Sequence, residues 1–218
     1  MTRVRVHNFG VSLDGYGAGA GQSLEAPFGH ADGRLMQWFM GTSTFRAMQG
    51  APGGSAGVDE AFASTWATGI GAEIMGRNKF GPERGPWSDT EWRGWWGENP
   101  PFHTPVFVLT HYPRPPFEME GGTTFHFIDA TPAEALALAS EAAGDLDVRI
   151  GGGVATVRQF LAADLIDHLH LVVSPIILGR GENLWQGLEG IESRYDIEAV
   201  SSPSGVTHLT FTRKPLSP

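Results

Sequence analysis

The chain has 218 residues, of which 41% are hydrophobic and 18% are charged, and its formal net charge at pH 7 is −9. This length allows one large domain or two small ones with a buried core. No apolar run approaches the ~20 residues that span a bilayer. The sequence also lacks a block of Lys and Arg residues of the kind that binds a nucleic acid. The absence of cysteine excludes disulfides, thiolate metal sites and cysteine nucleophiles, and it fits a cytoplasmic protein.

Strand and helix patterns alternate in the first half of the chain, which predicts a layered α/β sheet. Four glycines between residues 15 and 21 predict a loop too flexible for regular structure, and a Pro-Gly breaker at 51–54 separates two helical stretches. In chain order we expect a strand at 3–11, helices at 33–48 and 58–68, a strand at 72–75 and a Trp-rich loop at about 81–105.

The clearest signals for the start and end of a helix lie in the second half of the chain. There Thr131 is followed by Pro132 and Glu134, the pattern of a capping box. Gly144 ends that helix. No internal repeat or long linker divides the chain, so we expect one domain over residues 1–218. Around this helix we expect strands at 105–110, 124–128, 147–150 and 166–174, and a C-terminal hairpin of 195–200 and 206–212.

Three consecutive glycines, Gly151 to Gly153, join the strand at 147–150 to a helix that starts near Val154. Because they carry no Cβ atoms, their N–H groups can approach a ligand closely. The start of a helix also favours a phosphate through its unpaired N–H groups and its dipole. The same residues suit a tight strand-to-helix turn that binds nothing, so this segment alone leaves both interpretations open.

A second strand ends in Met75-Gly76-Arg77-Asn78, where a glycine precedes a fixed cation. A guanidinium in this place can pair with a phosphate, although Arg77 would also be ordinary as a surface ion-pair residue. Thr110-His111 marks the end of a third strand. Three such strand ends favour a dinucleotide that lies across the edge of one sheet.

Other nucleotide and hydrolase motifs are missing. The first strand is not followed by Gly-x-Gly-x-x-Gly, and the sequence contains neither a P-loop nor a Gly-x-Ser-x-Gly elbow. His168 and His170 could face one way on a strand and hold a metal. Because no third ligand lies nearby in the sequence, we expect them to be solvent-facing or interface residues, and we expect no metal site.

Five short motifs follow one another along the chain: Ser12-Leu13-Asp14-Gly15, Met75-Gly76-Arg77, Val108-Leu109-Thr110, Ile150-Gly151-Gly152-Gly153, and the run from Leu171 to Gly181. Together they resemble the dihydrofolate reductase-like superfamily. Within it, the chain is similar to the branch of the riboflavin-biosynthesis reductase domain, which is the C-terminal part of a bifunctional deaminase-reductase. The resemblance covers nearly the whole chain in the right order.

The resemblance implies a three-layer α/β/α fold with a mixed, mostly parallel sheet and a C-terminal antiparallel hairpin. It also implies a homodimer that binds NADPH along the carboxyl ends of the strands. Asp14 would lie near the nicotinamide and the substrate, where it would organise a proton, and residues 15–21 would form a mobile flap. Asp14 could equally be a turn-forming residue whose carboxylate bonds the backbone. The implied cofactor contacts are Gly76, Arg77, Asn78, Thr110, His111, Gly151, Gly152, Gly153, Val154, Ala155 and Thr156, and the implied substrate contacts are Trp38, Leu178 and Gly179.

The chain departs from this pattern on the substrate side. Folate reductases hold the pterin with a carboxylate in the first helix, whereas residues 35–39 contain no acid. The riboflavin branch grips a ribose phosphate with basic residues, whereas Glu182 follows Arg180-Gly181 here. Aromatic residues could instead line a pocket for a flat heterocycle, or they could pack the long loop onto the domain or form a dimer contact. They are Trp38, Phe39, Trp87, Trp92, Trp95, Trp96 and Phe102.

These features predict an NADPH-dependent reductase of a small conjugated heterocycle that is pterin-, pyrimidine- or flavin-like. Two alternatives stay open: a nucleotide-binding redox sensor without chemistry, and an enzyme that uses FMN at the same phosphate loops. We expect a small-molecule substrate and a second copy of the chain as partners, and neither nucleic acid nor membrane. The apolar strand at 166–178 would need covering by the C-terminal hairpin and a second subunit.

Overall fold

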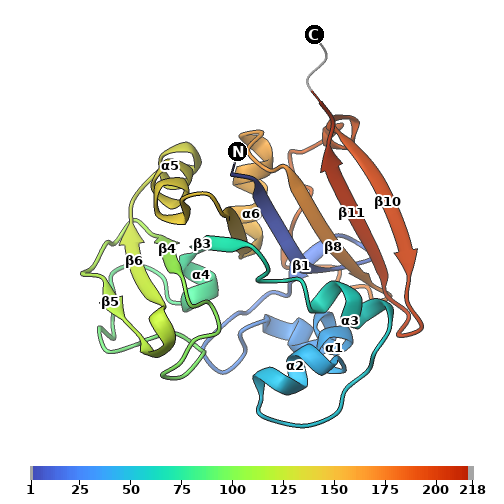
Figure 1. Cartoon of the computed structure of the whole chain (residues 1–218), viewed down its shortest axis with the longest axis horizontal. Helices are drawn as coiled ribbons and strands as arrows, with labels where there is room; N and C mark the ends of the chain where they lie inside the picture. Colours follow the sequence, from blue (N-terminus) through green and yellow to red (C-terminus); the bar gives the residue numbers. More distant parts are fainter. Residues whose placement is uncertain (1, 216–218) are drawn as a thin grey trace.

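A nine-stranded mixed sheet forms the centre of the molecule in a computed structural model that describes residues 2–215 (Figure 1). Its strand order is β10-β11-β8-β1-β7-β3-β4-β6-β5, and a separate pair is formed by β2 and β9. The strands from β8 to β6 run parallel, while β11 pairs antiparallel with β8 and β10, and β5 pairs antiparallel with β6. The strands are β1 (Val4–Ser12), β2 (Tyr16–Ala18), β3 (Ile70–Gly76), β4 (Pro105–Leu109), β5 (Phe117–Glu118), β6 (Thr124–Ile128), β7 (Asp147–Gly152), β8 (His168–Ser174), β9 (Glu182–Asn183), β10 (Tyr195–Ser201) and β11 (Thr207–Arg213).

Helices cover both faces of the sheet, which gives three layers (Figure 1). The two longest helices, α5 and α6, pack on one face against β3, β4 and β7, while α3 packs on the other. None of the helices in residues 2–215 is long and apolar enough to cross a bilayer. The α-helices are α1 (Gln37–Met40), α2 (Ser43–Met48), α3 (Val58–Ala63), α4 (Arg77–Phe80), α5 (Pro132–Ala143) and α6 (Val154–Ala162), and the 3₁₀ helices are η1 (Gly29–Leu35), η2 (Glu120–Gly122) and η3 (Ile191–Arg194).

The two faces of the sheet differ in chemistry because strand side chains alternate between them. The face under α5 and α6 is apolar and forms the largest core cluster, which buries apolar side chains from both helices and from β1, β3 and β7. The opposite face carries polar residues at paired positions, since Arg5 of β1 lies opposite Arg149 of β7 and His168 of β8. Glu73 of β3 in turn lies opposite Arg149.

The predicted fold class is confirmed: the sheet is mixed and mostly parallel, helices flank it, and the chain ends in an antiparallel hairpin. The capping box is also present, because the Thr131 hydroxyl and the Glu134 carboxylate each bond the backbone N–H of the other residue. The hairpin of β10 and β11 covers β8, which is therefore an interior strand. The hairpin alone covers that apolar edge, so β8 gives no reason to require a second subunit.

Three local predictions were wrong. The helical stretch at 33–48 is broken into η1, α1 and α2, and the helix expected at 58–68 ends at Ala63. Residues 15–21 are not wholly irregular, because Tyr16–Ala18 forms β2 and pairs with β9. A glycine-rich composition permits flexibility, but main-chain pairing to a strand far along the chain can still order it.

Candidate cofactor and active site

Two helices begin side by side at the carboxyl edge of the parallel strands. α4 begins directly after Gly76, at the end of β3, and α6 begins after Gly153, which is its N-cap. A Cβ on Gly76 would overlap the Thr156 hydroxyl and would lie 3.6 Å from the Gly153 nitrogen. The bare backbone at Gly76 therefore lets the two helix starts converge. In the first turn of α6, Val154 and Thr156 are buried and Ala155 is exposed.

The glycine turn that precedes α6 has one crowded side and one open side. A Cβ on Gly151 would overlap the Glu73 carboxylate and lie 2.7 Å from Nζ of Lys79, whereas a Cβ on Gly153 would meet no atom within 4 Å. Gly152 has a φ of 112°, a left-handed value that favours glycine. Because the first N–H groups of a helix have no partner within it, the open side at Gly153 can admit an anion.

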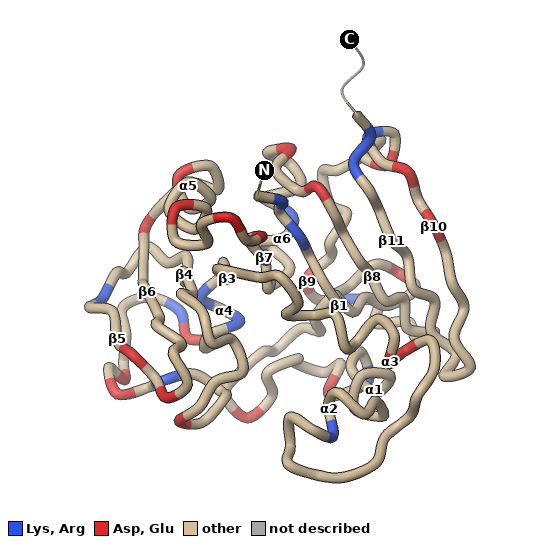
Figure 2. The backbone as a smooth tube through the Cα atoms, in the orientation of Figure 1, with Lys and Arg blue, Asp and Glu red and all other residues tan. Residues whose placement is uncertain are grey.

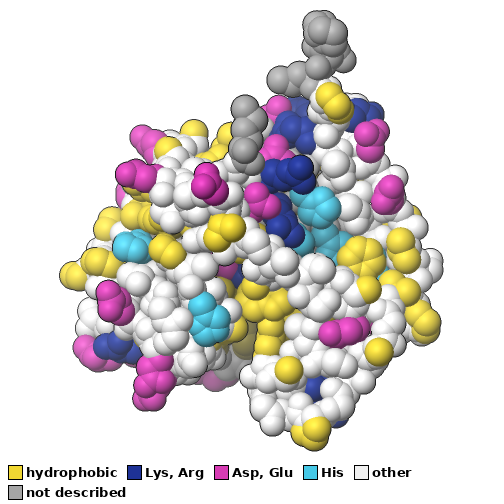
Figure 3. Space-filling view, viewed as in Figure 1, with side chains coloured by type: hydrophobic (Ala, Val, Ile, Leu, Met, Phe, Trp, Pro, Cys, Tyr) yellow, Lys and Arg dark blue, Asp and Glu magenta, His cyan; other side chains and the backbone are white. Residues whose placement is uncertain are grey.

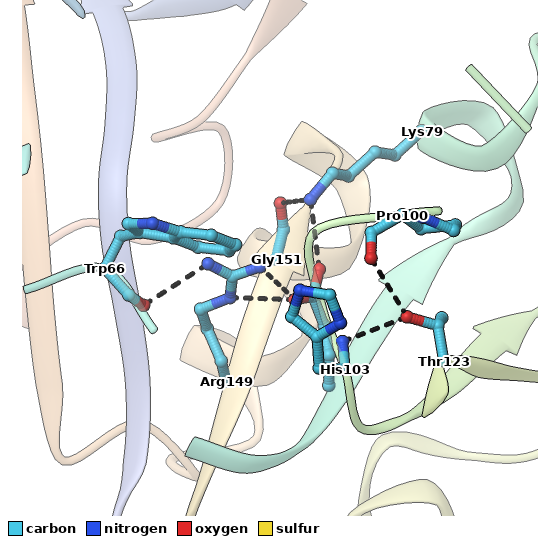
Figure 4. Close-up of polar contacts among 8 residues, drawn as sticks. Trp66, Lys79, Pro100, His103, Thr123, Arg149 and Gly151 are labelled. Atoms are coloured by element: carbon cyan, nitrogen blue, oxygen red, sulfur yellow. Dashed lines mark hydrogen bonds and ion pairs between the residues drawn. The ribbon is translucent and has the colours of Figure 1, made fainter. Parts of the chain in front are cut away.

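The crowded side of the turn holds a buried ion cluster that the sequence patterns did not predict (Figure 4). Lys79 Nζ lies 2.7 Å from the Gly151 carbonyl oxygen and 3.1 Å from Glu73 Oε1. Arg149 Nε lies 2.9 Å from Glu73 Oε2, and its guanidinium stacks 4.3 Å from the Trp66 ring. Burial lowers the pKa of Lys79, against the attraction of Glu73.

Arg77 lies beneath the Trp-rich loop and not on open surface. Its Cζ is 3.8 Å from the centre of the Trp87 ring and 5.6 Å from that of Tyr112, and Nη1 donates to the Gly85 carbonyl. Its Nε and Nη2 are buried without a hydrogen-bond partner, and Arg77 forms no ion pair within residues 2–215. The arrangement differs from that of a surface ion-pair residue, and it leaves two nitrogens, Nε and Nη2, that could donate hydrogen bonds to an anion.

The other expected phosphate contacts border the same edge of the sheet. Thr110 is buried at the end of β4, whereas the side chain of His111 is 90% exposed and lies 3.0 Å from Asp129 Oδ1. Asn78 donates from Nδ2 to Gln22 Oε1 at 2.8 Å, while its own Oδ1 is buried without a partner. Asn78 thus ties the start of α4 to the segment that follows β2.

Asp14 is fully engaged in holding a loop. One carboxylate oxygen accepts the Ser12 hydroxyl at 2.6 Å and the Leu178 N–H at 3.1 Å, and the other accepts the Gly179 N–H at 2.6 Å. The hydrogen bond from Ser12, followed by those from the two backbone N–H groups, lowers the pKa of Asp14 to about 2. A carboxylate that stays ionised cannot give a proton near neutral pH, so this geometry favours the turn-forming interpretation.

The structure brings the expected substrate residues to two places. Leu178 and Gly179 lie against Asp14, at the end of β1. Trp38 is buried, 5.3 Å from the His208 ring, and its Nε1 has no partner. Asn8 of β1, which the sequence reasoning missed, has a left-handed φ of 56° and a buried carboxamide without partners on Oδ1 or Nδ2. The signal for Asn8 in the sequence was an amide side chain within a predicted strand.

The Trp-rich loop packs onto the molecule through its indoles. Trp92 donates to the Phe80 carbonyl at 2.9 Å, and Trp95 donates to the Lys79 carbonyl at 2.9 Å. Arg114 holds the loop from the other side, with hydrogen bonds to the carbonyls of Thr90 and Trp92. Trp87, Trp92 and Trp96 pack against a second aromatic core cluster. These contacts match the packing alternative and not a substrate pocket.

His168 and His170 do not both face solvent. His170 is 2% exposed, with Phe62 of α3 stacked 4.5 Å from its ring, whereas His168 is half-buried. They border a cavity of about 360 Å³ beside His7 and Arg5, where the space-filling view shows histidines next to basic side chains (Figure 3). Residues 2–215 contain no group of three ligands able to hold a metal.

The segment expected to be a mobile flap is packed on the glycine turn. A Cβ on Gly17 of β2 would lie 2.8 Å from Val154 Cγ2 and 3.0 Å from the Phe9 ring. A Cβ on Gly152 would lie 3.4 Å from the same ring. Phe9 therefore fills the space between β2 and the turn, and it links the Asp14 end of β1 to the start of α6.

Known proteins of similar structure are reductases and riboflavin-biosynthesis proteins. A riboflavin biosynthesis protein from Shewanella sp. PV-4 aligns over 99% of this chain and all of its own, with 23% identity and a TM-score of 0.58. A pyrimidine reductase-like protein from Corynebacterium diphtheriae aligns over 98% of this chain and 92% of its own, with 16% identity and a TM-score of 0.51. At these identities the likeness shows the fold alone.

A bifunctional protein from Thermotoga maritima shows the same fold. It is a diaminohydroxyphosphoribosylaminopyrimidine deaminase/5-amino-6-(5-phosphoribosylamino)uracil reductase, with 12% identity and a TM-score of 0.55. This chain aligns over 98% of its own length and covers 57% of that chain. A search of curated protein sequences found no match.

The sequence itself matches the family model of the RibD C-terminal domain over residues 4–209. This match includes the glycine turn, the start of α4 and the loop that Asp14 holds. Together with the fold it supports an oxidoreductase that acts on a heterocycle. The chain belongs to the RibD C-terminal domain family.

Proposed function

We propose that this chain is an NADP(H)-dependent reductase of a small conjugated heterocycle that is pterin-, pyrimidine- or flavin-like. The observation that carries the proposal is the convergence of two helix starts at Gly76 and Gly153, with open space at Gly153. Membership of the RibD C-terminal domain family supports the same conclusion.

The residues at the edge of the sheet fit a dinucleotide phosphate. The first N–H groups of α6 would hold the pyrophosphate on the open side of the turn. Arg77 offers two unpaired N–H donors for a 2′-phosphate, and the faces of Trp87 and Tyr112 lie beside it. Figure 2 shows basic residues on α4, which follows β3 at this edge of the sheet.

When bound, the reduced nicotinamide would supply the hydride, so the protein has to align two rings and exclude water. Asp14 would orient the loop at Leu178 and Gly179, and Phe9 would hold β2 against the turn. The unpaired carboxamide of Asn8 and indole N–H of Trp38 would bind polar atoms of the heterocycle.

The test is a binding titration followed by a turnover assay. We expect tryptophan fluorescence to be quenched by NADPH at micromolar concentrations, because Trp87 lies beside Arg77. Oxidation of NADPH should then be followed with pterins, pyrimidines, flavins and quinones. Binding of FMN without NADPH would overturn the choice of cofactor, and NADPH binding without turnover on any of these would favour a redox sensor.

A further inference from the structure

The cluster beneath the glycine turn carries one more positive charge than negative. Lys79 and Arg149 share a single carboxylate, that of Glu73, and neither has another acidic partner within residues 2–215. The side chains of Arg149 and Glu73 are 7% and 2% exposed, and that of Lys79 is 27% exposed. A buried excess charge is unfavourable unless a counter-charge approaches. The open side of the same turn is a place where an anion can approach.

Lys79 also fixes the orientation of the turn. Its ammonium donates to the Gly151 carbonyl oxygen at 2.7 Å. In a trans peptide the C=O and the following N–H point in opposite directions, and the Gly151–Gly152 bond is trans. Holding the Gly151 oxygen on the crowded side therefore directs the Gly152 N–H away from the cluster.

We propose that Lys79 is a positioning residue for the pyrophosphate of the dinucleotide, because it holds the Gly151 peptide and supplies the positive charge that Glu73 leaves uncompensated. This proposal rests on the proposed function. Lys79 acts on the part that NADPH and NADH share, so its loss should weaken both equally. Arg77, at the 2′-phosphate end, should distinguish the two cofactors.

The charge of Lys79 gives the proposal a pH signature. Burial lowers the pKa of Lys79 below its ordinary value, so the ammonium should lose its proton at a lower pH than that of an exposed lysine. The charged groups that face it are Glu73 from β3 and Arg149 from β7, and the loop presents the ring of Phe102 at 5.7 Å. Carboxylates and guanidinium groups ordinarily titrate outside pH 7–10. Affinity for a dinucleotide should therefore fall as the pH rises and Lys79 loses its charge.

The experiment measures dissociation constants by calorimetry for NADPH, NADH and inorganic pyrophosphate. It compares the natural protein with Lys79→Met, which keeps the length of the side chain, and with Lys79→Arg, which restores the charge. Lys214→Met is the matched control, because Lys214 is the only other lysine and its Nζ bonds the distant Ser193 carbonyl at 3.0 Å. Circular dichroism verifies that each variant is folded.

We expect Lys79→Met to weaken all three ligands by about 10- to 100-fold, the loss of one charge-assisted interaction. Lys79→Arg should recover most of the affinity, and Lys214→Met should change nothing. Affinity of the natural protein for NADPH and NADH should fall as the pH rises from 7, while that of Lys79→Met stays level. If Lys79→Met does not fold, the pH series decides, and a constant affinity across it would overturn the proposal.

Failure of this inference can be distinguished from failure of the proposed function. NADPH binding that is unchanged in a folded Lys79→Met overturns the role of Lys79 and leaves the reductase intact. If the natural protein binds pyrophosphate but no nicotinamide dinucleotide, the proposed function fails, and loss of pyrophosphate in Lys79→Met still supports the role of Lys79. A natural protein that binds neither ligand overturns both.

Discussion

His170 Nε2 lies 3.0 Å from His208 Nδ1 inside the molecule, and this contact fixes the protonation of both rings. His170 Nδ1 accepts the Asn8 N–H at 3.1 Å, so its proton must be on Nε2, which donates to His208. His208 then carries its proton on Nε2 and donates to Asp59 Oδ1 at 2.9 Å. These hydrogen bonds connect β1, β8, β11 and α3.

The first prediction is that stability falls on mild acidification. Burial lowers the pKa of His170 to about 3 and that of His7 to about 2, from the ordinary 6.5. The unfolded chain therefore binds protons that the folded chain cannot, so the stabilisation present above pH 6.5 is lost as the pH falls toward 3. Each histidine contributes up to about 1.4 kcal/mol per pH unit in this range.

Urea unfolding between pH 7 and 5 measures this slope before most carboxylates titrate. His170→Gln should be less stable at pH 7 and should show a shallower slope. His111→Gln is the control, because the side chain of His111 is 90% exposed. A free energy of unfolding that does not change between pH 7 and 5 would contradict the prediction.

The second prediction concerns Arg77 and the choice between NADPH and NADH. If its unpaired N–H groups bind a 2′-phosphate, Arg77→Ala should weaken NADPH by about 10- to 100-fold and NADH far less. Dissociation constants for both cofactors measure the ratio. Arg93→Ala, on the Trp-rich loop, should leave it unchanged. Equal losses for both cofactors would instead place Arg77 at the pyrophosphate or outside the site.

The third prediction separates two glycines of the same turn. Gly151→Ala should destabilise the protein, because its Cβ would overlap the Glu73 carboxylate. Gly153→Ala should fold normally, since no atom lies within 4 Å of its Cβ, but it should weaken NADPH by filling the space for the phosphate. Thermal unfolding and NADPH titration measure the two effects. A Gly153→Ala variant with unchanged affinity would move the phosphate away from this turn.

The fourth prediction assigns Asp14 to loop positioning. Because the pKa of Asp14 is about 2, turnover between pH 5 and 9 should show no ionisation of this group. Asp14→Asn places an N–H₂ group against the N–H donors of Leu178 or Gly179, so turnover should fall while the shape of the pH profile stays the same. An acidic limb that is present in the natural protein and lost in Asp14→Asn would show that Asp14 transfers a proton.

The fifth prediction is a homodimer. β10 is an edge strand whose residues after Tyr195 are all exposed, including Ile197 and Val200 at 45% and 41%. An unpaired edge with apolar side chains favours pairing with another chain. Light scattering should give a mass near twice 23.4 kDa, and Ile197→Lys should reduce it. A mass near 23 kDa at micromolar concentration would refute the dimer.

Features encoded by neighbouring residues could be predicted from the sequence. The capping box at Thr131 needs only the next three residues, and the glycine turn before α6 is continuous in the chain. The broken helices at 33–48 could not be predicted, because their ends depend on packing against β1 and β8 and not on local propensity.

The clusters of polar side chains inside the molecule could not be predicted without the three-dimensional structure. Glu73 and Arg149 are 76 residues apart and meet only through the register of β3 and β7. The alternation of β8 indicated that His168 and His170 share a face, but not that α3 would cover His170. Arg77 was recognised by its place after Gly76, yet its stacking under Trp87 depends on the path of a loop without periodic pattern.

The hydrogen bond from Asn78 to Gln22 connects the start of α4 with the segment that follows β2. Asn78 lies in the first turn of α4, beside the expected phosphates, and Gln22 follows β2, which packs on the glycine turn and on Phe9. We expect a displacement of either element to be transmitted to the other through this bond. The cofactor and the substrate of the proposed reductase should therefore influence each other's affinity, and by the same factor in both directions.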